Sequence, residues 1–381
     1  MSAEYHIVGL NVKFTFEFAL LKNLRIRYAV SQPFKKAKNM KEIILNSRPD
    51  GIPTANSFKL VDWTPKKLSS GEVLVEVQSF SLDPYMRGRM DDAKSYSAPV
   101  ELGARMEAGG VGRIIESASA SFTGGDYIFG MTGWASHAIL NEKAVRKLAL
   151  KQQHLTRALG VLGMPGFTGW FGLNQFGHPK SGETLVVAAA TGPVGSIVGQ
   201  LAKRVGLNVV GLAGTDEKCR IAIEDFGFDQ CLNHRAYHSS KELRNALSNY
   251  CLNGIDIYFE NVAGPILEAI LPMMNVHGRI PLCGMISWYN AGRLGADALF
   301  DTLSLPKMWR TILVKRLSIN GFIISDHWKQ FPNFLKEVEP LVNEGVIKYI
   351  EDITQGLENA PQKFIGMLDG KNHGKTIIQL F

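Results

Sequence analysis

Residues 183–218 read ETLVVAAATGPVGSIVGQLAKRVGLNVVGLAGTDEK, and this stretch decides the fold. The run 184–189 is apolar, as expected of a strand that is buried on both faces of a parallel sheet. A glycine turn follows it, then a helical pattern over 196–204 and a second apolar strand over 208–213. Strand, turn, helix and strand at this spacing predict a βαβ unit, and with it an α/β fold with a doubly wound parallel sheet.

The turn in this unit carries a variant of the dinucleotide-binding fingerprint. Ala190, Gly192 and Gly195 have its spacing, with Ala in place of the first Gly. Amides at the start of the following helix are suited to bind a pyrophosphate. We therefore expect dinucleotide contacts from Thr191, Gly192, Pro193, Val194 and Gly195.

The end of the second strand indicates which dinucleotide is bound. NAD sites usually have an acidic residue there, which binds the ribose 2′-hydroxyl. This strand instead ends in Gly214 and Thr215, with Lys218 just beyond, and a cation there favours the 2′-phosphate of NADP. The alternative is that Lys218 only begins a solvated helix and that Asp216 takes the acid's role. The pattern favours NADPH as the cofactor.

Composition agrees with an enzyme of two domains. The chain has 381 residues, of which 45% are hydrophobic, so it is long and apolar enough to bury a sizeable core. Its formal net charge is +7, but seven basic and only two acidic side chains fall in residues 1–40. The rest of the chain lacks the clustered basic field of a nucleic-acid-binding surface, so we expect no nucleic-acid partner there.

Cysteine usage and hydropathy indicate a reducing compartment. The four cysteines are scattered without a CxxC pair, which predicts neither a disulfide framework nor a structural zinc site. They are Cys219, Cys231, Cys251 and Cys283. No run reaches the roughly 18 to 20 apolar residues needed to cross a bilayer, since Lys13, Glu17 and Lys22 break the apolar start. We expect a cytoplasmic protein without membrane association.

Changes in the spacing of apolar residues divide the remaining chain into predicted domains. Residues 59–147 read as short strands with turns, which predicts a mostly β domain. Its clearest strands lie at 73–79, 109–116, 125–129 and 135–140. From 159 to about 322, strands alternate with helices, and further strands are expected at 255–260, 278–283 and 318–323. A helix is predicted over 328–346 and a strand over 375–380, which could return to the first domain. The run MPGFTG, near residues 163–168, has the Gly and Pro content of a hinge beside a cleft.

Ten motifs between residues 40 and 381 resemble one family. They are SRPDGIP (47–53), LDPYMRGRM (82–90), GGVGRIIES (109–117), LGMPGFTGWFGL (162–173), AAATGPVG (188–195), EKC (217–219), YFENVAG (258–264), CGMISWYN (283–290), GFIISD (321–326) and GKNHGK (370–375). The chain resembles the zinc-independent medium-chain dehydrogenase/reductases, and among them the NADPH-dependent curcumin and alkenal reductases and their prostaglandin-reductase relatives. LNH at 232–234 is similar to the LDH of the bacterial curcumin-reductase type. Departures from the family pattern are Trp170 for Tyr and Ala263 for Gly.

The resemblance implies a domain plan. It predicts a GroES-like, mostly β catalytic domain at 40–163 and 324–381, and a Rossmann NADP-binding domain at 164–323. It also implies a homodimer. Residues 1–39 lie outside the resemblance as an N-terminal extension, which could be an upstream start-site extension, an accessory segment or a disordered basic arm. We favour an extension without a catalytic role.

A comparison within the larger superfamily argues against a metal. Zinc alcohol dehydrogenases carry a Gly-His-Glu segment where this chain has Gly109, Gly110 and Val111, so no ligands remain there. Without a Lewis acid to polarise an alcohol or carbonyl, the expected chemistry is hydride delivery to an activated carbon–carbon double bond.

The resemblance also implies a mechanism for a small-molecule enone substrate. NADPH would give hydride to the β-carbon of an α,β-unsaturated ketone or aldehyde, and the enolate would be stabilised and then protonated at the α-carbon. Tyr85 and Tyr289 are the candidate hydrogen-bond donors or proton sources. Either could instead be a core tyrosine with a satisfied hydroxyl. Arg87 and Arg89 are expected only to brace the β domain.

On the cofactor side, the resemblance implies that His234 joins Lys218 near the 2′-phosphate, and that Asn261 lies near the ribose and Asn372 of the tail contacts the cofactor. The nicotinamide half would be lined by Cys283, Gly284, Ser287, Tyr289, Phe322, Ile323 and Ile324. Asn372 could equally be a turn former, and Cys283 is better explained as an apolar packing residue that contributes backbone groups than as a nucleophile. Two other functions stay open, a quinone reductase of the same fold and an NADPH-binding protein without turnover.

Overall fold

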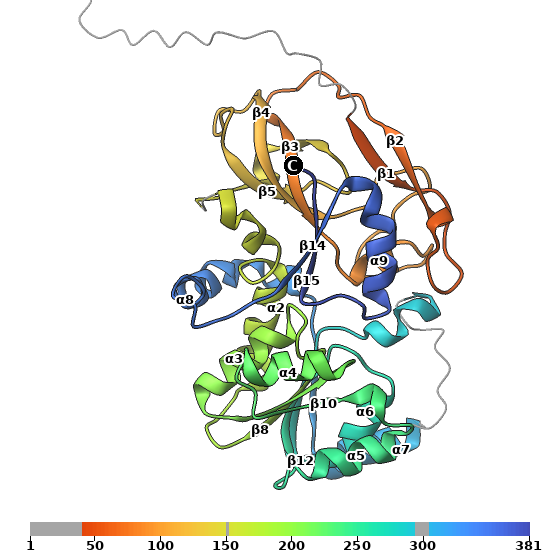
Figure 1. Cartoon of the computed structure of the whole chain (residues 1–381), viewed down its shortest axis with the longest axis vertical. Coiled ribbons are helices and arrows are strands. Elements are labelled where there is room, and N and C mark those ends of the chain that lie inside the picture. The colour runs from red at the N-terminus through yellow and green to blue at the C-terminus, as the bar shows by residue number, and fades with distance from the viewer. Residues whose placement is uncertain (1–39, 150–151, 294–304) are drawn as a thin grey trace, which may run out of the picture. The chain divides into compact units, whose positions relative to one another are not determined.

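The structure, a computed structural model, describes residues 40–149, 152–293 and 305–381, and the predicted N-terminal extension lies outside them. Asn39–Phe381 form one compact unit. Three sheets organise it: one of six strands, one of seven, and an antiparallel pair of β1 (Lys41–Leu45) and β2 (Phe58–Asp62) (Figure 1). No helix in these described ranges is long and apolar enough to cross a membrane.

The six-stranded sheet is the predicted doubly wound sheet, and all its neighbouring strands are parallel. Its strands are β8 (Thr184–Ala188), β9 (Asn208–Ala213), β10 (Gln230–Asn233), β11 (Ile255–Phe259), β12 (Met274–Leu282) and β13 (Ser318–Gly321). Their order in space is β10-β9-β8-β11-β12-β13. The chain therefore winds outward from β8 in one direction, returns, and continues from β11 in the other. The carboxyl ends of β8 and β11 flank the switch point, where doubly wound sheets bind ligands.

Helices cover both faces of this sheet because its strands are apolar on both faces. Leu185 and Val187 belong to the core that packs against α3 (Gly195–Val205) and α4 (Asp216–Glu224). Val186 and Ala188 belong to the opposite core, which packs against α5 (Ser240–Ser248) and α6 (Pro265–Ile270). Side chains alternate along a strand, so one short apolar run serves two cores.

The seven-stranded sheet is mixed and makes up most of the β part. Its strands are β3 (Glu72–Ser81), β4 (Gly109–Ser117), β5 (Tyr127–Met131), β6 (His137–Asn141), β7 (Arg146–Lys147), β14 (Glu351–Gln355) and β15 (Lys375–Gln379). The C-terminal strand β15 pairs antiparallel with β3, which confirms that the tail returns to the first domain. The core beneath is aromatic: the Trp134 ring stacks 5.3 Å from Phe58 and lies 5.5 Å from Phe364 of α9 (Ala360–Leu368).

Two segments differ from what their sequence pattern indicates. MPGFTG, whose Gly and Pro content is typical of a hinge, forms the start of α2 (Met164–Gly172), because Pro165 occupies its first turn, where proline favours helix initiation. A Cβ on Gly169 would lie 2.4 Å from the Ile197 side chain, so this glycine permits close packing of α2 on α3. The helix predicted over 328–346 is a 3-10 turn, Ile324–Gln330, followed by α8 (Phe331–Asn343).

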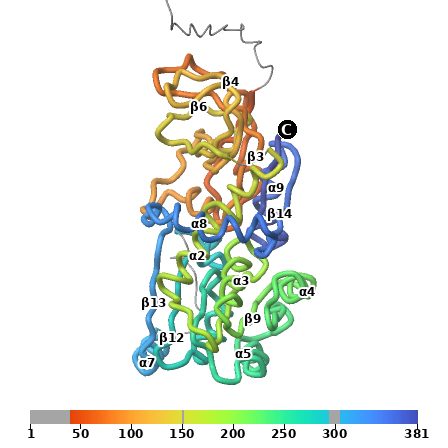
Figure 2. The backbone as a smooth tube through the Cα atoms, turned by 90° about the vertical axis from the view of Figure 1, so that its left-hand side faces the viewer, coloured from red at the N-terminus to blue at the C-terminus, as the bar shows by residue number. Residues whose placement is uncertain are grey.

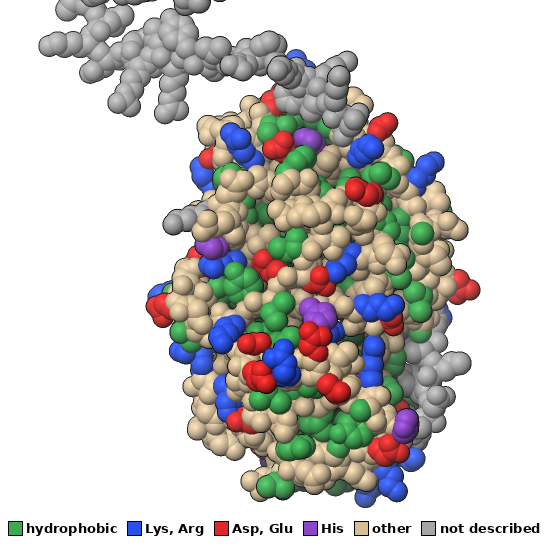
Figure 3. Space-filling view, in the orientation of Figure 1, with side chains coloured by type: hydrophobic (Ala, Val, Ile, Leu, Met, Phe, Trp, Pro, Cys, Tyr) green, Lys and Arg blue, Asp and Glu red, His purple; other side chains and the backbone are tan. Residues whose placement is uncertain are grey.

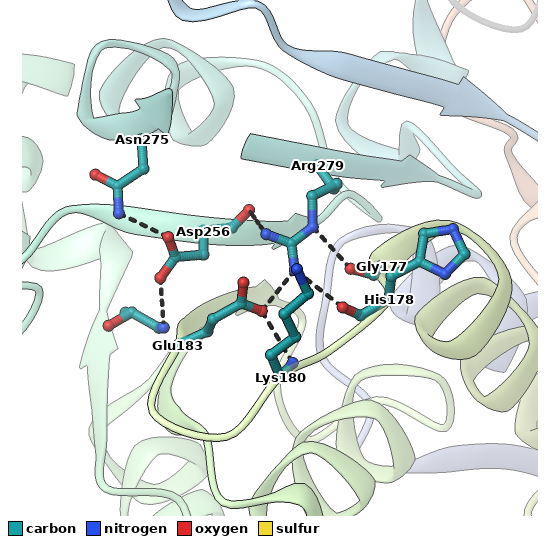
Figure 4. A network of polar contacts seen from close by, with 8 residues as sticks. Gly177, His178, Lys180, Glu183, Asp256, Asn275 and Arg279 are labelled. Carbon is teal, nitrogen blue, oxygen red and sulfur yellow. Dashed lines mark hydrogen bonds and ion pairs between the residues drawn. The ribbon is translucent and has the colours of Figure 1, made fainter. Parts of the chain in front are cut away.

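A polar network ties the amino-terminal edge of the six-stranded sheet together (Figure 4). Arg279 pairs with Glu183 at 2.5 Å and donates to the carbonyls of Gly177 and His178 at 2.9 and 3.1 Å. Asp256 accepts from the Thr184 amide at 2.9 Å and from Asn275 Nδ2 at 2.8 Å. Because the strands are parallel, their carboxyl ends all lie at the other edge, away from this network.

Candidate cofactor and substrate site

The turn after β8 is shaped for the close approach of a ligand. Ala189 adopts a left-handed φ of 52°, and its carbonyl accepts from the Gly192 amide at 2.8 Å. A Cβ on Gly195 would lie 2.3 Å from that carbonyl oxygen, so only glycine fits there. Ala190 stands where the fingerprint has its first Gly, and its methyl group is accommodated because residue 211 of the neighbouring strand is glycine. A Cβ on Gly211 would lie 2.8 Å from that methyl group. The turn is therefore as tight as the dinucleotide fingerprint requires, and it leads directly into the amino terminus of α3, which suits a pyrophosphate.

Lys218 lies at the end of β9 in a position that suits a phosphate. Thr215 caps α4 by accepting from the Lys218 amide at 3.2 Å, which places Lys218 in the first turn. Its side chain is only 8% exposed, and Nζ donates to the Gly370 carbonyl at 2.7 Å. Lys218 is thus buried, unlike the solvated lysine of the alternative interpretation. Asp216, the acid of that alternative, accepts from Asn233 Nδ2 at 2.9 Å.

Positive charge gathers at this corner. Burial lowers the pKa of Lys218, and the charge of Arg235 lowers it further. Burial, Arg235 and Lys218 together lower the pKa of His234 to about 4, so this imidazole is neutral at pH 7. Two like charges held this close would be relieved by an anion between them.

Arg235 is a residue that the sequence reasoning missed. Its Nη2 donates to the Asp369 carbonyl at 2.9 Å, and a Cβ on Gly214 would lie 3.3 Å from its Nε. The guanidinium therefore lies over the end of β9, beside the Lys218 corner. A basic residue directly after His234 was the only sequence signal for it.

Asn261 bridges the switch point of the sheet. Its Nδ2 donates to the Ala188 carbonyl at the end of β8 at 2.9 Å, and its Oδ1 accepts from the Cys283 thiol beyond β12 at 2.8 Å. Burial raises the pKa of that thiol well above its usual range, with a further contribution from Glu260. Cys283 is therefore a protonated hydrogen-bond donor here, which agrees with a packing role and not with a nucleophile.

Hydrogen bonds join the loop after β11 to the loop after β12. The buried Glu260 carboxylate accepts from the Val262 and Ala263 amides at 2.7 and 2.8 Å, and the Val262 carbonyl accepts from the Ser287 amide and hydroxyl. Ala263 has a φ of 67°, where the family pattern has glycine. These contacts place Gly284 and Ser287 at the carboxyl edge of the sheet.

The two candidate phenols are both neutral groups that can donate a hydrogen bond. Burial raises the pKa of Tyr289 to about 12, and its oxygen accepts from the Met285 amide at 3.3 Å. A Cβ on Gly284 would lie 3.3 Å from that oxygen, so glycine leaves room for the hydroxyl. Burial, Asp83 and Glu107 raise the pKa of Tyr85 far above its usual value.

Tyr96 and Arg89 join this group, and the sequence reasoning missed Tyr96. Tyr96 contributes to the raised pKa of both Tyr85 and Tyr289. The Arg89 guanidinium lies 4.9 Å from the Tyr96 ring and 5.8 Å from the Tyr85 ring, and it pairs with Glu107 at 3.4 Å. Arg89 is therefore part of this cluster and more than a brace.

Other predicted cofactor residues have their side chains engaged elsewhere. The Phe322 ring packs in the core, 6.0 Å from Phe171 and 5.3 Å from Phe176, and its amide donates to the Leu282 carbonyl at 3.2 Å. Ile323 and Ile324 start the 3-10 turn after β13. Asn372 Nδ2 donates to the Gly374 carbonyl at 2.8 Å, the turn-forming role of its alternative interpretation.

A buried ion pair connects the tail to the loop before Tyr85. Lys375 Nζ lies 2.5 Å from Asp83 Oδ1 and 2.9 Å from the Leu82 carbonyl oxygen. Burial lowers the pKa of Lys375, which Asp83 opposes. A lysine at the start of the apolar strand KTIIQ was the sequence signal for this contact. Among the described residues, no group of three or more His, Cys, Asp or Glu side chains could hold a metal ion.

Comparison with known families matches two profiles to the chain. Residues 41–148 match a family described as the N-terminal domain of oxidoreductase. Residues 193–340 match a family described as zinc-binding dehydrogenase.

Similar proteins span nearly the whole described chain. The NADPH-dependent curcumin reductase of Escherichia coli (strain K12) is 47% identical over 340 residues, which cover 88% of this chain and 96% of that protein. The 2-alkenal reductase (NADP(+)-dependent) of Nicotiana tabacum is 38% identical, covering 89% and 97%. Prostaglandin reductase 1 of Mus musculus is 38% identical, covering 87% and 96%.

Solved structures share the fold of this chain. CurA from Vibrio vulnificus in complex with NADPH is 43% identical, with a TM-score of 0.84 over 90% of this chain and 99% of that chain. The NADPH complex of Escherichia coli quinone oxidoreductase is 17% identical, with a TM-score of 0.67 over 89% and 99%, and this likeness concerns the fold alone.

Proposed function

The chain belongs to the medium-chain dehydrogenase/reductase family, in the branch of the NADPH-dependent curcumin, alkenal and prostaglandin reductases, and we propose that it reduces the carbon–carbon double bond of α,β-unsaturated ketones and aldehydes with NADPH. The observation that carries this proposal is the pair of groups that lie at the carboxyl edge of the six-stranded sheet. A cationic corner at Lys218 follows β9, and a neutral phenol, Tyr289, follows β12. The first suits a 2′-phosphate and the second suits a carbonyl oxygen that gains negative charge.

We assign the cofactor to the residues along this edge. The glycine turn fits a pyrophosphate, because a side chain at Gly195 would collide with the backbone. Lys218, His234 and Arg235 would hold the 2′-phosphate, and Asn261 the ribose. The remaining contacts would come from Thr191, Gly192, Pro193, Val194, Cys283, Gly284, Ser287, Tyr289, Phe322, Ile323, Ile324 and Asn372.

The protein's part in the reaction is to orient the enone, to stabilise the negative charge that forms on its carbonyl oxygen, and to supply the proton that the α-carbon takes up. When bound, NADPH supplies the hydride that adds to the β-carbon. We assign Tyr289 to donate a hydrogen bond to the carbonyl oxygen, with Tyr85 as the second donor. Their raised pKa values keep both phenols protonated at neutral pH, so each can donate throughout the reaction. One of them then gives its proton to the α-carbon of the enolate, and the resulting phenolate regains a proton from solvent.

Oxidation of NADPH and NADH in the presence of a short alkenal, a phenyl enone, curcumin and a quinone tests the proposal. Turnover of the enones with strong NADPH preference is the expected result. Turnover of the quinone alone would favour the quinone-reductase alternative, and NADPH binding without turnover of any acceptor would favour a non-catalytic role.

We further propose that two copies of the chain associate through the β13 edge of the six-stranded sheet. In α7 (Leu305–Lys315), Leu305, Trp309 and Leu313 are 67%, 65% and 76% exposed and recur every fourth residue, so they share one face. Figure 2 shows α7 at the same side as β13, which has no second neighbouring strand among the described residues. An open edge next to an apolar helix fits a second copy of the same surface. Light scattering should show a dimer that Trp309→Glu converts to a monomer.

A cytoplasmic location is part of the same proposal. All four cysteines are free thiols, which persist in reducing compartments. On the face shown in Figure 3, basic and acidic side chains are interspersed. This distribution supports a small-molecule enzyme over a protein with a nucleic-acid-binding surface.

A further inference from the structure

A completely buried arginine lies two residues after Tyr85. Arg87 belongs to the short helix α1 (Tyr85–Arg89) and has no exposed surface. Its Nε and Nη2 donate to the Gly51 carbonyl at 3.2 and 2.8 Å, and its Nη1 pairs with Asp91 Oδ1 at 2.5 Å. A buried guanidinium is stable only when it is paired in this way, so the contacts of Arg87 are well defined.

The partner carboxylate of Arg87 reaches a different part of the chain. Asp91 Oδ2 accepts from the Arg293 amide at 2.8 Å, at the end of the segment that follows β12. That segment contains the 3-10 turn Ile286–Ala291 and therefore Tyr289. Gly51 lies near it as well, since a Cβ built on Gly51 would be 3.9 Å from the Asn290 carbonyl oxygen.

One guanidinium and its carboxylate thus join three segments. Residues 47–53 and α1 belong to the β part of the chain, and residues 286–293 leave the six-stranded sheet. Two of these segments carry the candidate phenols, with Tyr85 in α1 and Tyr289 in the turn. Arg87 therefore does more than brace the β domain, which was the sequence-based expectation.

We propose that Arg87 and Asp91 form a clasp that positions Tyr289 relative to Tyr85, and that both are positioning residues for enone reduction. The inference rests on the proposed function. Neither residue needs to touch the substrate, because each acts through the backbone that holds a phenol. A displacement of about 1 Å at a reacting group can lower a rate by about 100-fold. Loss of the clasp should therefore lower kcat, while the Lys218 corner continues to bind NADPH.

The decisive variant removes both charges together, as Arg87→Met with Asp91→Leu. Replacing a buried ion pair by apolar residues of similar volume is often neutral for stability, so this protein should fold. Asp91→Glu is the milder second variant, because it keeps the charge beside Arg87 and displaces only the oxygens. The matched control is the Arg105–Glu42 pair, 2.5 Å apart in the same part of the chain, replaced as Arg105→Met with Glu42→Leu.

Three measurements are made on the wild type and each variant: enone turnover, NADPH affinity by fluorescence titration, and hydrogen–deuterium exchange. In both clasp variants we expect kcat to fall by about 10- to 100-fold and exchange in residues 286–293 to become faster. NADPH affinity should change by a much smaller factor than kcat, because the contacts of the glycine turn and of Lys218 are untouched. The control should change none of these. Wild-type kcat in a folded clasp variant, or unchanged exchange in residues 286–293, would overturn the inference.

The two proposals fail differently in this experiment. If the wild type reduces no enone, the proposed function fails, while the exchange comparison still decides whether the clasp holds residues 286–293. If the wild type reduces enones and the clasp variants do so equally well, the function stands and the clasp is refuted.

Discussion

Replacing Tyr289 by Phe tests the proposed chemistry at its centre. Loss of one donor to a developing oxyanion lowers kcat by about 100- to 1000-fold in comparable enzymes. Tyr85 remains as a second donor, so we expect the lower end of this range, about 100-fold, or about 2.7 kcal/mol of transition-state stabilisation. The effect on stability should be small by comparison. The phenol oxygen accepts a hydrogen bond from the Met285 amide at 3.3 Å, and such a neutral bond contributes about 1 kcal/mol.

The assay compares kcat/KM for an enone and for a quinone in the same preparations. An enone builds charge on a carbonyl oxygen that needs a donor, so its reduction should fall in Tyr289→Phe while quinone reduction changes little. Tyr250→Phe is the matched control, because Tyr250 is 43% exposed and follows α5. Equal enone kcat/KM in wild type and Tyr289→Phe, with both proteins folded by thermal melting, would refute the role of this phenol.

Three further predictions concern Lys218 and His234, which we assign to the 2′-phosphate, and Arg279 at the amino-terminal edge of the six-stranded sheet. Lys218→Ala should raise the KM for NADPH by about 10- to 100-fold and leave that for NADH unchanged, as measured by steady-state kinetics, because one charge-assisted contact is lost. The pKa of His234 lies at about 4 in the folded protein and about 6.5 when unfolded. Between these values only the unfolded chain binds the proton, so the free energy of unfolding should fall as pH drops through that window, and His234→Gln should flatten this slope in denaturant titrations. Arg279→Met should lower the free energy of unfolding by about 2 to 3 kcal/mol, since Glu183 loses its ion pair and three carbonyls lose a donor, while kcat stays at the wild-type value.

The fold could be predicted from sequence where a local pattern carries the information. Residues 184–188 and 208–213 are apolar on both faces, and burial on both faces of a sheet requires this pattern. The composition of MPGFTG did not predict α2, because Gly and Pro also serve helix initiation and close packing, as at Pro165 and Gly169. Composition alone does not separate these uses.

The site was predictable mainly on its cofactor side. The glycine turn and Lys218 lie within one continuous unit, so their spacing in sequence reflects their spacing in the structure. The Lys375–Asp83 pair joins residues almost 300 positions apart, and Asp91 connects Arg87 to Arg293, about 200 positions further along the chain. Such contacts depend on how the two sheets come together, and no local pattern records them.

The segment 283–293 shows why both sheets matter for the chemistry. At its start, Ser287 is fixed to the Val262 carbonyl, and the Val262 amide is fixed by Glu260 at the end of β11. At its end, the Arg293 amide is fixed by Asp91, which belongs to the β part of the chain. Tyr289 lies between these two anchors, so its position depends on the six-stranded sheet at one side and on Arg87 at the other. A change in either anchor should move the phenol relative to the carboxyl edge of the six-stranded sheet. The position of Tyr289 therefore depends on both the six-stranded sheet and the β part of the chain.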